Sequence, residues 1–177
     1  MDTLDQLKYP VGKFALDADV SPEKRAARIA DIAGLPQSLR RAVQGLSKEQ
    51  LDTPYREGGW STRQIVHHLA DSHMNTLLRL KLCLTEKEPA ITVYSQDAWA
   101  RTADVLTVEP HVSVGILEGV HARMAVLLGS LGPEDFARTY KHPERGPMDV
   151  DYTIQLYAWH GRHHLAQISA LRQRQDW

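Results

Sequence analysis

Residues 157–168, YAWHGRHHLAQI, set three histidines inside one apolar run with helical spacing. An α-helix turns once every 3.6 residues, so His160 and His164 lie one turn apart on a single face. Ile168 and Leu171 continue that face, which marks it as the core side. Two neutral imidazoles at this spacing can bind one transition metal ion, because their Cβ atoms lie about 5–6 Å apart. A third ligand must come from another part of the chain.

The comparable stretch is residues 64–73, QIVHHLADSH, which again places histidines in an apolar helical pattern. His68 lies next to Leu69 and one turn from Ile65, whereas His67 lies at the boundary of the apolar face. We therefore expect His68 to be the third ligand. Three histidines without a carboxylate or cysteine ligand leave coordination positions open on zinc, nickel or ferrous iron, which is typical of catalysis rather than of a structural site.

The remaining histidines are expected outside the ligand set. His73 lies on the flank of this pattern and is expected to be solvated or hydrogen-bonded. His163 lies about a hundred degrees from His164 around the helix. The others are expected at the surface or in ordinary hydrogen bonds: His111, His121 and His142.

Length and composition favour one domain, residues 1–177, large enough to bury a core without disulfides. The formal net charge is −1 and no long basic or acidic block occurs, so a small-molecule partner is favoured over nucleic acid. Cys83 is the single cysteine, which excludes an intrachain disulfide and a cysteine-rich metal site and favours the cytoplasm. We expect no signal peptide and no apolar stretch of the ~18–20 residues that a membrane span needs.

Four long helical segments with little strand signal between them predict an all-α four-helix bundle. The first starts at Ser21-Pro22 and runs to about Gly45 as one kinked helix or two short ones, because Gly34-Leu35-Pro36 interrupts it. The others are expected from Ser61 to about Thr85, from near Ser113 to the Gly132-Pro133 stop, and from a cap at Asp149 or Asp151 through Leu171.

The connections are expected to be irregular. Residues 1–20 form an extended surface arm, and short capped turns occur near residues 47–50, 95–99 and 133–136. The long connection after Glu88-Pro89 lets the chain cross over the bundle. Residues 140–148, rich in proline and glycine, are expected to be a loop or, alternatively, a small hairpin near the site.

Several motifs taken together resemble a known family. They are LDTPYREGGWS (residues 51–61), VHHLADSHMN (66–75), YAWH (157–160) and HH (163–164), with YPVG (9–12) and YKHP (140–143) extending the likeness over nearly the whole chain. These residues resemble the YfiT branch of the DinB-like superfamily, a group of metal-dependent hydrolases.

The resemblance implies a four-helix bundle that holds one divalent metal ion, Zn²⁺ or Ni²⁺, through one histidine of the second long helix and two of the last. In this sequence those positions are His68, His160 and His164, the residues that the burial pattern also selects. The resemblance and the long N-terminal arm also suggest a homodimer.

Three functions remain open at this point. In a hydrolase, the metal ion lowers the pKa of water and polarises the substrate. In an S-transferase, which the wider superfamily suggests, the same position binds a low-molecular-weight thiol such as bacillithiol as its thiolate. The third alternative is a metal-binding bundle without catalysis. No catalytic base is assigned, because Asp71 can equally orient the His68 imidazole, and Cys83 is expected to be a small core residue.

Overall fold

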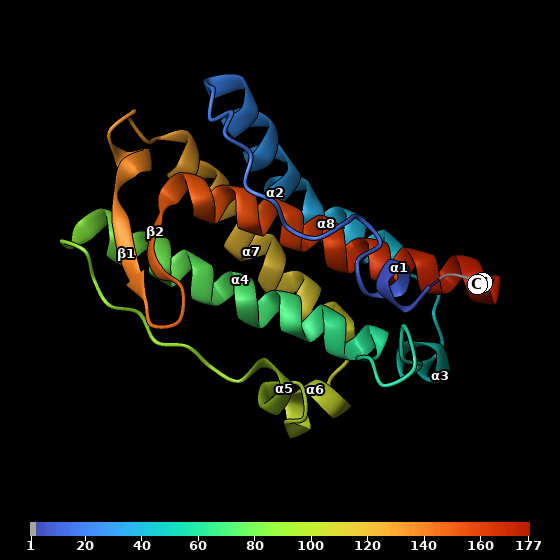
Figure 1. Ribbon diagram of the computed structural model, residues 1–177. Coiled ribbons are helices and arrows are strands. Elements are labelled where there is room, and N and C mark those ends of the chain that lie inside the picture. The colour runs from blue at the N-terminus through green and yellow to red at the C-terminus, as the bar shows by residue number, and fades with distance from the viewer. Residues whose placement is uncertain (1–2) are drawn as a thin grey trace.

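The computed structural model describes residues 3–177, and four long helices dominate it (Figure 1). They are α2 (Pro22–Val43), α4 (Thr62–Thr85), α7 (Pro110–Gly129) and α8 (Val150–Gln175). Helix α2 packs against α7 and α8, and α4 packs against the same two helices. The order around the bundle is therefore α2, α7, α4, α8, so that α2 and α4 are diagonal, as are α7 and α8. This arrangement confirms the predicted bundle and brings α4 beside α8.

Local capping defines where the key helices begin. The Ser61 hydroxyl accepts from the N–H of Gln64, and the Gln64 side chain accepts from the N–H of Ser61, which together complete a capping box. Ser21 caps α2 with Pro22 in its first position. The Asp149 carboxylate accepts from the N–H of Tyr152 and caps α8, which resolves the predicted choice between Asp149 and Asp151.

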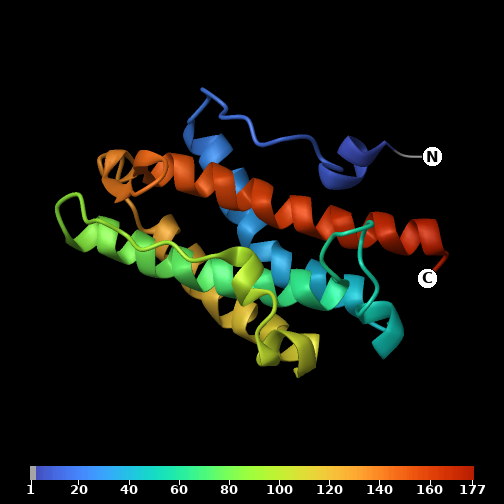
Figure 2. The ribbon, with the colours of Figure 1, turned by 60° about the horizontal axis from the view of Figure 1, so that its bottom comes forward.

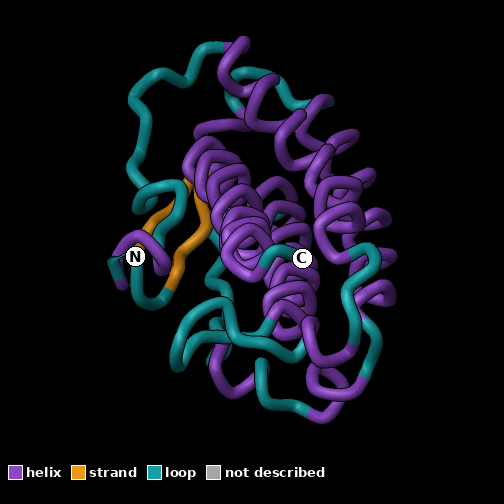
Figure 3. Tube along the Cα trace, turned by 90° about the vertical axis from the view of Figure 1, so that its right-hand side faces the viewer, coloured by secondary structure: helices purple, strands orange, loops and turns teal. Residues whose placement is uncertain are grey.

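Short elements occupy the connections: α1 (Leu4–Lys8), α3 (Lys48–Leu51), α5 (Gln96–Trp99), α6 (Ala103–Thr107) and a 3₁₀ turn, η1 (Asp135–Ala137). Strands β1 (Thr139–His142) and β2 (Gly146–Asp149) form an antiparallel hairpin in which Tyr140 pairs with Met148. Figure 3 shows these strands outside the group of helices. The hairpin alternative for residues 140–148 is therefore the correct one, and it is the departure from an all-α chain.

Two other features differ from the prediction, and one predicted choice is resolved. The arm is not extended throughout, because Thr3 and Gln6 form a capping box that starts α1; residues 1–2 lie outside the described part. Helix α2 runs unbroken through Pro36, so of the two predicted alternatives the single helix is correct. Helix α7 begins at Pro110 rather than near Ser113, and ends at Gly129 rather than Gly132.

Helix α7 also corrects the expectation about membrane spans. Its 20 residues are long and apolar enough, by length and composition alone, to match a membrane-spanning helix. In this structure α7 packs against α2 and α4, and His121 on its inward side is buried. Helix α7 thus supplies one wall of the bundle.

The core consists of two apolar clusters with a layer of histidines between them. One cluster includes Leu77, Met124 and Ile154, and the other includes Leu69, Leu117 and Ile168. Along α7 and α8 the inward-facing histidines occur between the residues of the two clusters. Buried imidazoles destabilise a core unless each polar nitrogen finds a partner, so this layer must be hydrogen-bonded or bind a ligand.

The N-terminal arm lies along α8 of its own chain (Figure 2). The amide of Gln155 makes two bonds to the backbone of Asp17, at 2.9 and 3.2 Å. The indole of Trp159 donates to the carbonyl of Gly12 at 3.1 Å, and Gln167 Nε2 donates to the carbonyl of Lys8 at 3.0 Å. Since the arm is held at three points of α8, it gives no support to the idea that it reaches over a partner subunit.

A candidate metal centre between two helices

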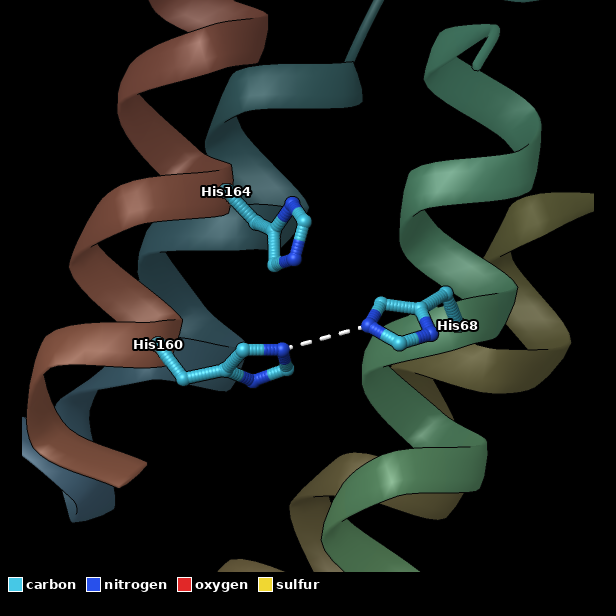
Figure 4. A group of neighbouring side chains, drawn as sticks. All are labelled: His68, His160 and His164. Atoms are coloured by element: carbon cyan, nitrogen blue, oxygen red, sulfur yellow. Dashed lines mark hydrogen bonds between the residues drawn. The ribbon is translucent and has the colours of Figure 1, made fainter. Parts of the chain in front are cut away.

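The structure brings the three predicted ligands together where α4 faces α8. His68 extends from α4, and His160 and His164 extend from successive turns of α8 (Figure 4). One ring nitrogen from each residue falls within 4.8 Å of those of the other two. The Nε2 atoms of His68 and His160 are 3.1 Å apart. A tetrahedral ion at ~2.1 Å from each nitrogen separates its ligands by about 3.4 Å, so this pair is already near coordinating distance.

All three imidazoles are neutral at neutral pH. Burial lowers the pKa of His68 to about 4. Burial, followed by the other histidines nearby, lowers the pKa of His160 and His164 well below the usual value. Metal ions bind the unprotonated ring nitrogen, so burial keeps these side chains in the form that coordinates.

His164 is oriented by a residue of its own helix. Gln167 Oε1 lies 2.8 Å from His164 Nδ1, and because an amide oxygen only accepts, Nδ1 carries the proton. The lone pair of His164 is therefore on Nε2. The amide nitrogen of Gln167 is directed away from His164, donating to Lys8 and to Nε2 of His163 at 3.1 Å. Gln167 thus connects the N-terminal arm to a candidate ligand.

The donor set fits a divalent transition ion. Three neutral imidazoles converge, and at least His164 has its free lone pair fixed by a hydrogen bond to the other nitrogen, as metal-ligating histidines do. Three protein ligands leave a position for water or substrate. That His68, His160 and His164 bind such an ion stays a prediction.

An aromatic side chain stands beside the three histidines. The Trp60 ring centroid is 4.7 Å from that of His68 and 6.3 Å from that of His164. The rings of Trp60 and His164 are nearly parallel, at 17°. The indole N–H donates to Asp97 of α5 at 3.2 Å. Residue 60 precedes the capping box of α4, so the same local motif that starts the helix places an apolar wall next to the site.

Four other histidines are not among the three that converge. His67 is buried against α7, with Nδ1 2.7 Å from the Ser113 hydroxyl and Nε2 3.1 Å from the Val108 carbonyl. Both ring nitrogens of His67 are therefore engaged in hydrogen bonds, which agrees with the prediction of His68 rather than His67 as the ligand. His163 is buried and stacked on Trp159 at 4.6 Å, behind His164. His111 is exposed and His142 is partly exposed.

Two histidines that the sequence placed outside the ligand set are hydrogen-bonded, as one of the expected alternatives had it, but their connection to His160 was not predicted. His73 is fully buried, so of its two expected states the hydrogen-bonded one is correct, and its Nε2 lies 3.2 Å from Nδ1 of His160. His121 is also buried, with Nε2 2.8 Å from Nδ1 of His73. A signal was present for His121, because it falls in the apolar stripe between Leu117 and Met124. The same signal was present for His73, which falls four positions after Leu69 and seven before Leu80 in the apolar stripe of α4.

Asp71 and Cys83, the other two residues considered from the sequence, do not contact the three candidate ligands through hydrogen bonds. Asp71 is half-buried, and burial followed by the charge of Asp104 raises its pKa to about 6. In the described part of the chain, the hydrogen bonds of His68 do not include Asp71, so it does not orient that imidazole. Cys83 is buried in an apolar cluster, and burial raises the pKa of its thiol, which matches the expected core role.

Comparison with known proteins agrees with this architecture. The model of the DinB superfamily matches residues 32–168. A protein of Oceanobacillus iheyensis named "Putative metal-dependent hydrolase" is 46% identical over 171 residues, covering 96% of this chain and 98% of that one. A Bacillus cereus protein of the same name is 46% identical over 175 residues, covering 98% of this chain and all of that one.

Among solved structures, YfiT from Bacillus subtilis superposes with a TM-score of 0.94 at 40% identity, covering 97% of this chain and 99% of that chain. It is described as "a probable metal-dependent hydrolase with an unusual four-helix bundle topology". The chain therefore belongs to the DinB superfamily, in the branch that contains YfiT.

Proposed function

We propose that this protein is a metal-dependent hydrolase of small molecules, with one divalent transition ion held by His68, His160 and His164. The convergence of three neutral imidazoles from α4 and α8 carries the proposal. Its full-length relatives are named as metal-dependent hydrolases, which supports the same activity here. Three nitrogen ligands and no thiolate suit Zn²⁺ or Ni²⁺, which we propose as the native metal.

The protein contributes ligands and surroundings rather than a nucleophile of its own. A bound ion supplies Lewis acidity, which lowers the pKa of water toward ~7 and polarises a substrate oxygen. Burial keeps the ligands unprotonated, and Gln167 holds His164 in the required orientation. The Trp60 wall gives an apolar surface for the part of the substrate that does not react.

The test is turnover of ester and amide panels by metal-free protein before and after reconstitution with Zn²⁺ or Ni²⁺, without any thiol. We expect hydrolysis only with metal, its loss in His160→Ala, and its retention in His67→Ala, which removes a buried histidine outside the site. If turnover instead begins only when a low-molecular-weight thiol and an electrophile are added, and saturates in the thiol, the protein is an S-transferase. If metal binds but neither panel is turned over, the site is a non-catalytic one.

We also propose a homodimer, using the outer face of α7. Val112, Ile116 and Val126 are exposed there and share one side of the helix. Light scattering on the protein at micromolar concentration should give twice the chain mass, and Val126→Glu should reduce it. A single-chain mass throughout this range contradicts the proposal.

The proposed compartment is the cytoplasm. The support is that Cys83, the single cysteine of the chain, is buried as a free thiol in an apolar cluster. Fractionation of cells that produce the tagged protein should recover it with cytoplasmic markers, and recovery with membranes or outside the cell contradicts this placement.

A further inference from the structure

Four groups form a continuous line of hydrogen bonds across the bundle and end at the candidate ligand His160. The line runs from the Ile32 carbonyl on α2 to His121 on α7, then to His73 on α4, and then to His160 on α8. It therefore touches each of the four long helices once. We propose that His121 and His73 are positioning residues that hold His160 in the tautomer whose Nε2 lone pair faces the metal site.

The Ile32 carbonyl decides which nitrogen donates in each hydrogen bond of the line. The Ile32 carbonyl can only accept, so Nδ1 of His121, its hydrogen-bond partner, must carry the proton. A neutral imidazole has one N–H, which leaves Nε2 of His121 as an acceptor. That atom lies 2.8 Å from Nδ1 of His73, so His73 donates to it.

The proton on His73 in turn decides which nitrogen of His160 carries a proton. With its proton on Nδ1, His73 has an acceptor at Nε2, which lies 3.2 Å from Nδ1 of His160. His160 must donate from Nδ1, and its lone pair is then on Nε2. This is the atom that faces Nε2 of His68 at 3.1 Å. The opposite direction would require the Ile32 carbonyl to donate, which it cannot do.

His73 and His121 are both neutral, because their surroundings disfavour the charged ring. Their exposed fractions are 0% and 1%. Their ring nitrogens contact each other, His160 and a backbone carbonyl, and no carboxylate takes part in these bonds. A buried imidazolium without an anionic partner costs far more free energy than a neutral ring in a complete hydrogen-bonded line.

This inference rests on the proposed metal site and adds residues that act on it indirectly. Loss of an outer hydrogen-bond partner of a ligating histidine typically weakens metal affinity 10–100-fold. In His121→Phe, the shape of the ring is kept but the acceptor for His73 is lost. His73 is then free to place its proton on Nε2 and to donate to His160, which would move the His160 proton to the nitrogen needed for the metal.

The experiment measures the tautomer and the metal affinity separately. In the metal-free protein, ¹⁵N NMR of the imidazoles, assigned by difference from His160→Ala, should show His160 protonated at Nδ1 and unprotonated at Nε2. In His121→Phe this preference should be lost, and competition with a chromophoric chelator should show Zn²⁺ bound about 10–100-fold more weakly. His121→Gln, whose side-chain oxygen can still accept from His73, should recover much of the affinity.

His67→Phe is the matched control, because it too removes a buried histidine with two hydrogen bonds. His67 lies on α4, and its partners are Ser113 and Val108 rather than members of the line. It should keep the affinity and the tautomer of the unaltered protein. The inference is overturned if His160 carries its proton on Nε2, or if folded His121→Phe binds Zn²⁺ as tightly as the control. If the unaltered protein binds no metal while the tautomer is as expected, the proposed function fails but the positioning does not.

Discussion

Nε2 of His68 lies 3.1 Å from Nε2 of His160, although 92 positions separate the two residues in the chain. The contact exists because the diagonal placement of α2 and α4 leaves α4 beside α8. Burial keeps both rings neutral, so the two Nε2 atoms at this distance either form a hydrogen bond, with the proton on one of them, or bind one metal ion. This contact therefore supplies two of the three nitrogen ligands of the proposed metal site.

Removal of any one ligand should remove the ion. His68→Ala, His160→Ala and His164→Ala should each fall from about one ion per chain to well below it in elemental analysis of purified protein. Metal should also stop protecting these variants against thermal unfolding, where the unaltered protein gains about 2.7 kcal/mol at a metal concentration 100 times Kd. His67→Ala should keep its metal; if it loses metal while His68→Ala keeps it, the choice between these neighbours is wrong.

The bond between Gln167 and His164 gives a second prediction. Gln167→Leu removes the acceptor for His164 Nδ1 and should weaken Zn²⁺ binding about 10–100-fold. Gln167→Glu keeps an acceptor there, but it cannot donate to the Lys8 carbonyl. Glu should therefore preserve metal affinity while amide exchange near Lys8 becomes faster. Equal affinity of the Leu and Glu variants would show that Gln167 does not orient the ligand.

Close packing next to His160 gives a third prediction. A Cβ on Gly161 would lie 2.6 Å from Leu35 Cδ2, so Gly161→Ala forces the buried Leu35 side chain and α2 away from α8. We expect a net loss of about 1–2 kcal/mol, since overpacking outweighs the better helix propensity of alanine. Gly34→Ala on α2 meets no atom within 4 Å and should instead gain about 0.5–1 kcal/mol. Denaturant unfolding compares the two, and a stabilised Gly161→Ala would contradict this packing.

Asp71 gives a prediction for pH. Burial raises the pKa of its carboxyl to about 6 in the folded protein, above the ~3.9 of the unfolded chain. The folded state therefore binds this proton more tightly, and the resulting stabilisation is full below pH ~4 and lost as the pH rises through about 6. Asp71→Asn should raise Tm more at pH 8 than at pH 4. The same Tm difference at both values would show that Asp71 is not perturbed.

The sequence predicted features that depend on local contacts. The Ser61 and Gln64 capping box and the His160 and His164 pair involve residues three or four positions apart, where helical geometry alone decides the outcome. The bond from His164 to Gln167 is equally local and could have been predicted. The start of α7 was placed near Ser113, whereas the helix begins at Pro110 and the Ser113 hydroxyl, already inside it, bonds His67.

The histidine line could not be predicted in the same way. His73 meets His160 across 87 positions, His121 meets His73 across 48, and the Ile32 carbonyl meets His121 across 89. These contacts follow from the order of the four helices around the bundle, which no local pattern encodes. A buried histidine in the apolar stripe of α7 showed only that some partner was needed.

The most direct test is anomalous X-ray diffraction from crystals of the protein loaded with Ni²⁺ or Zn²⁺, measured on both sides of the absorption edge of the metal. The account predicts one anomalous peak per chain, about 2.0–2.1 Å from Nε2 of His68, His160 and His164, with a further position open to solvent or substrate. A peak held by other residues, or no peak between α4 and α8 in protein shown to be folded, would contradict it.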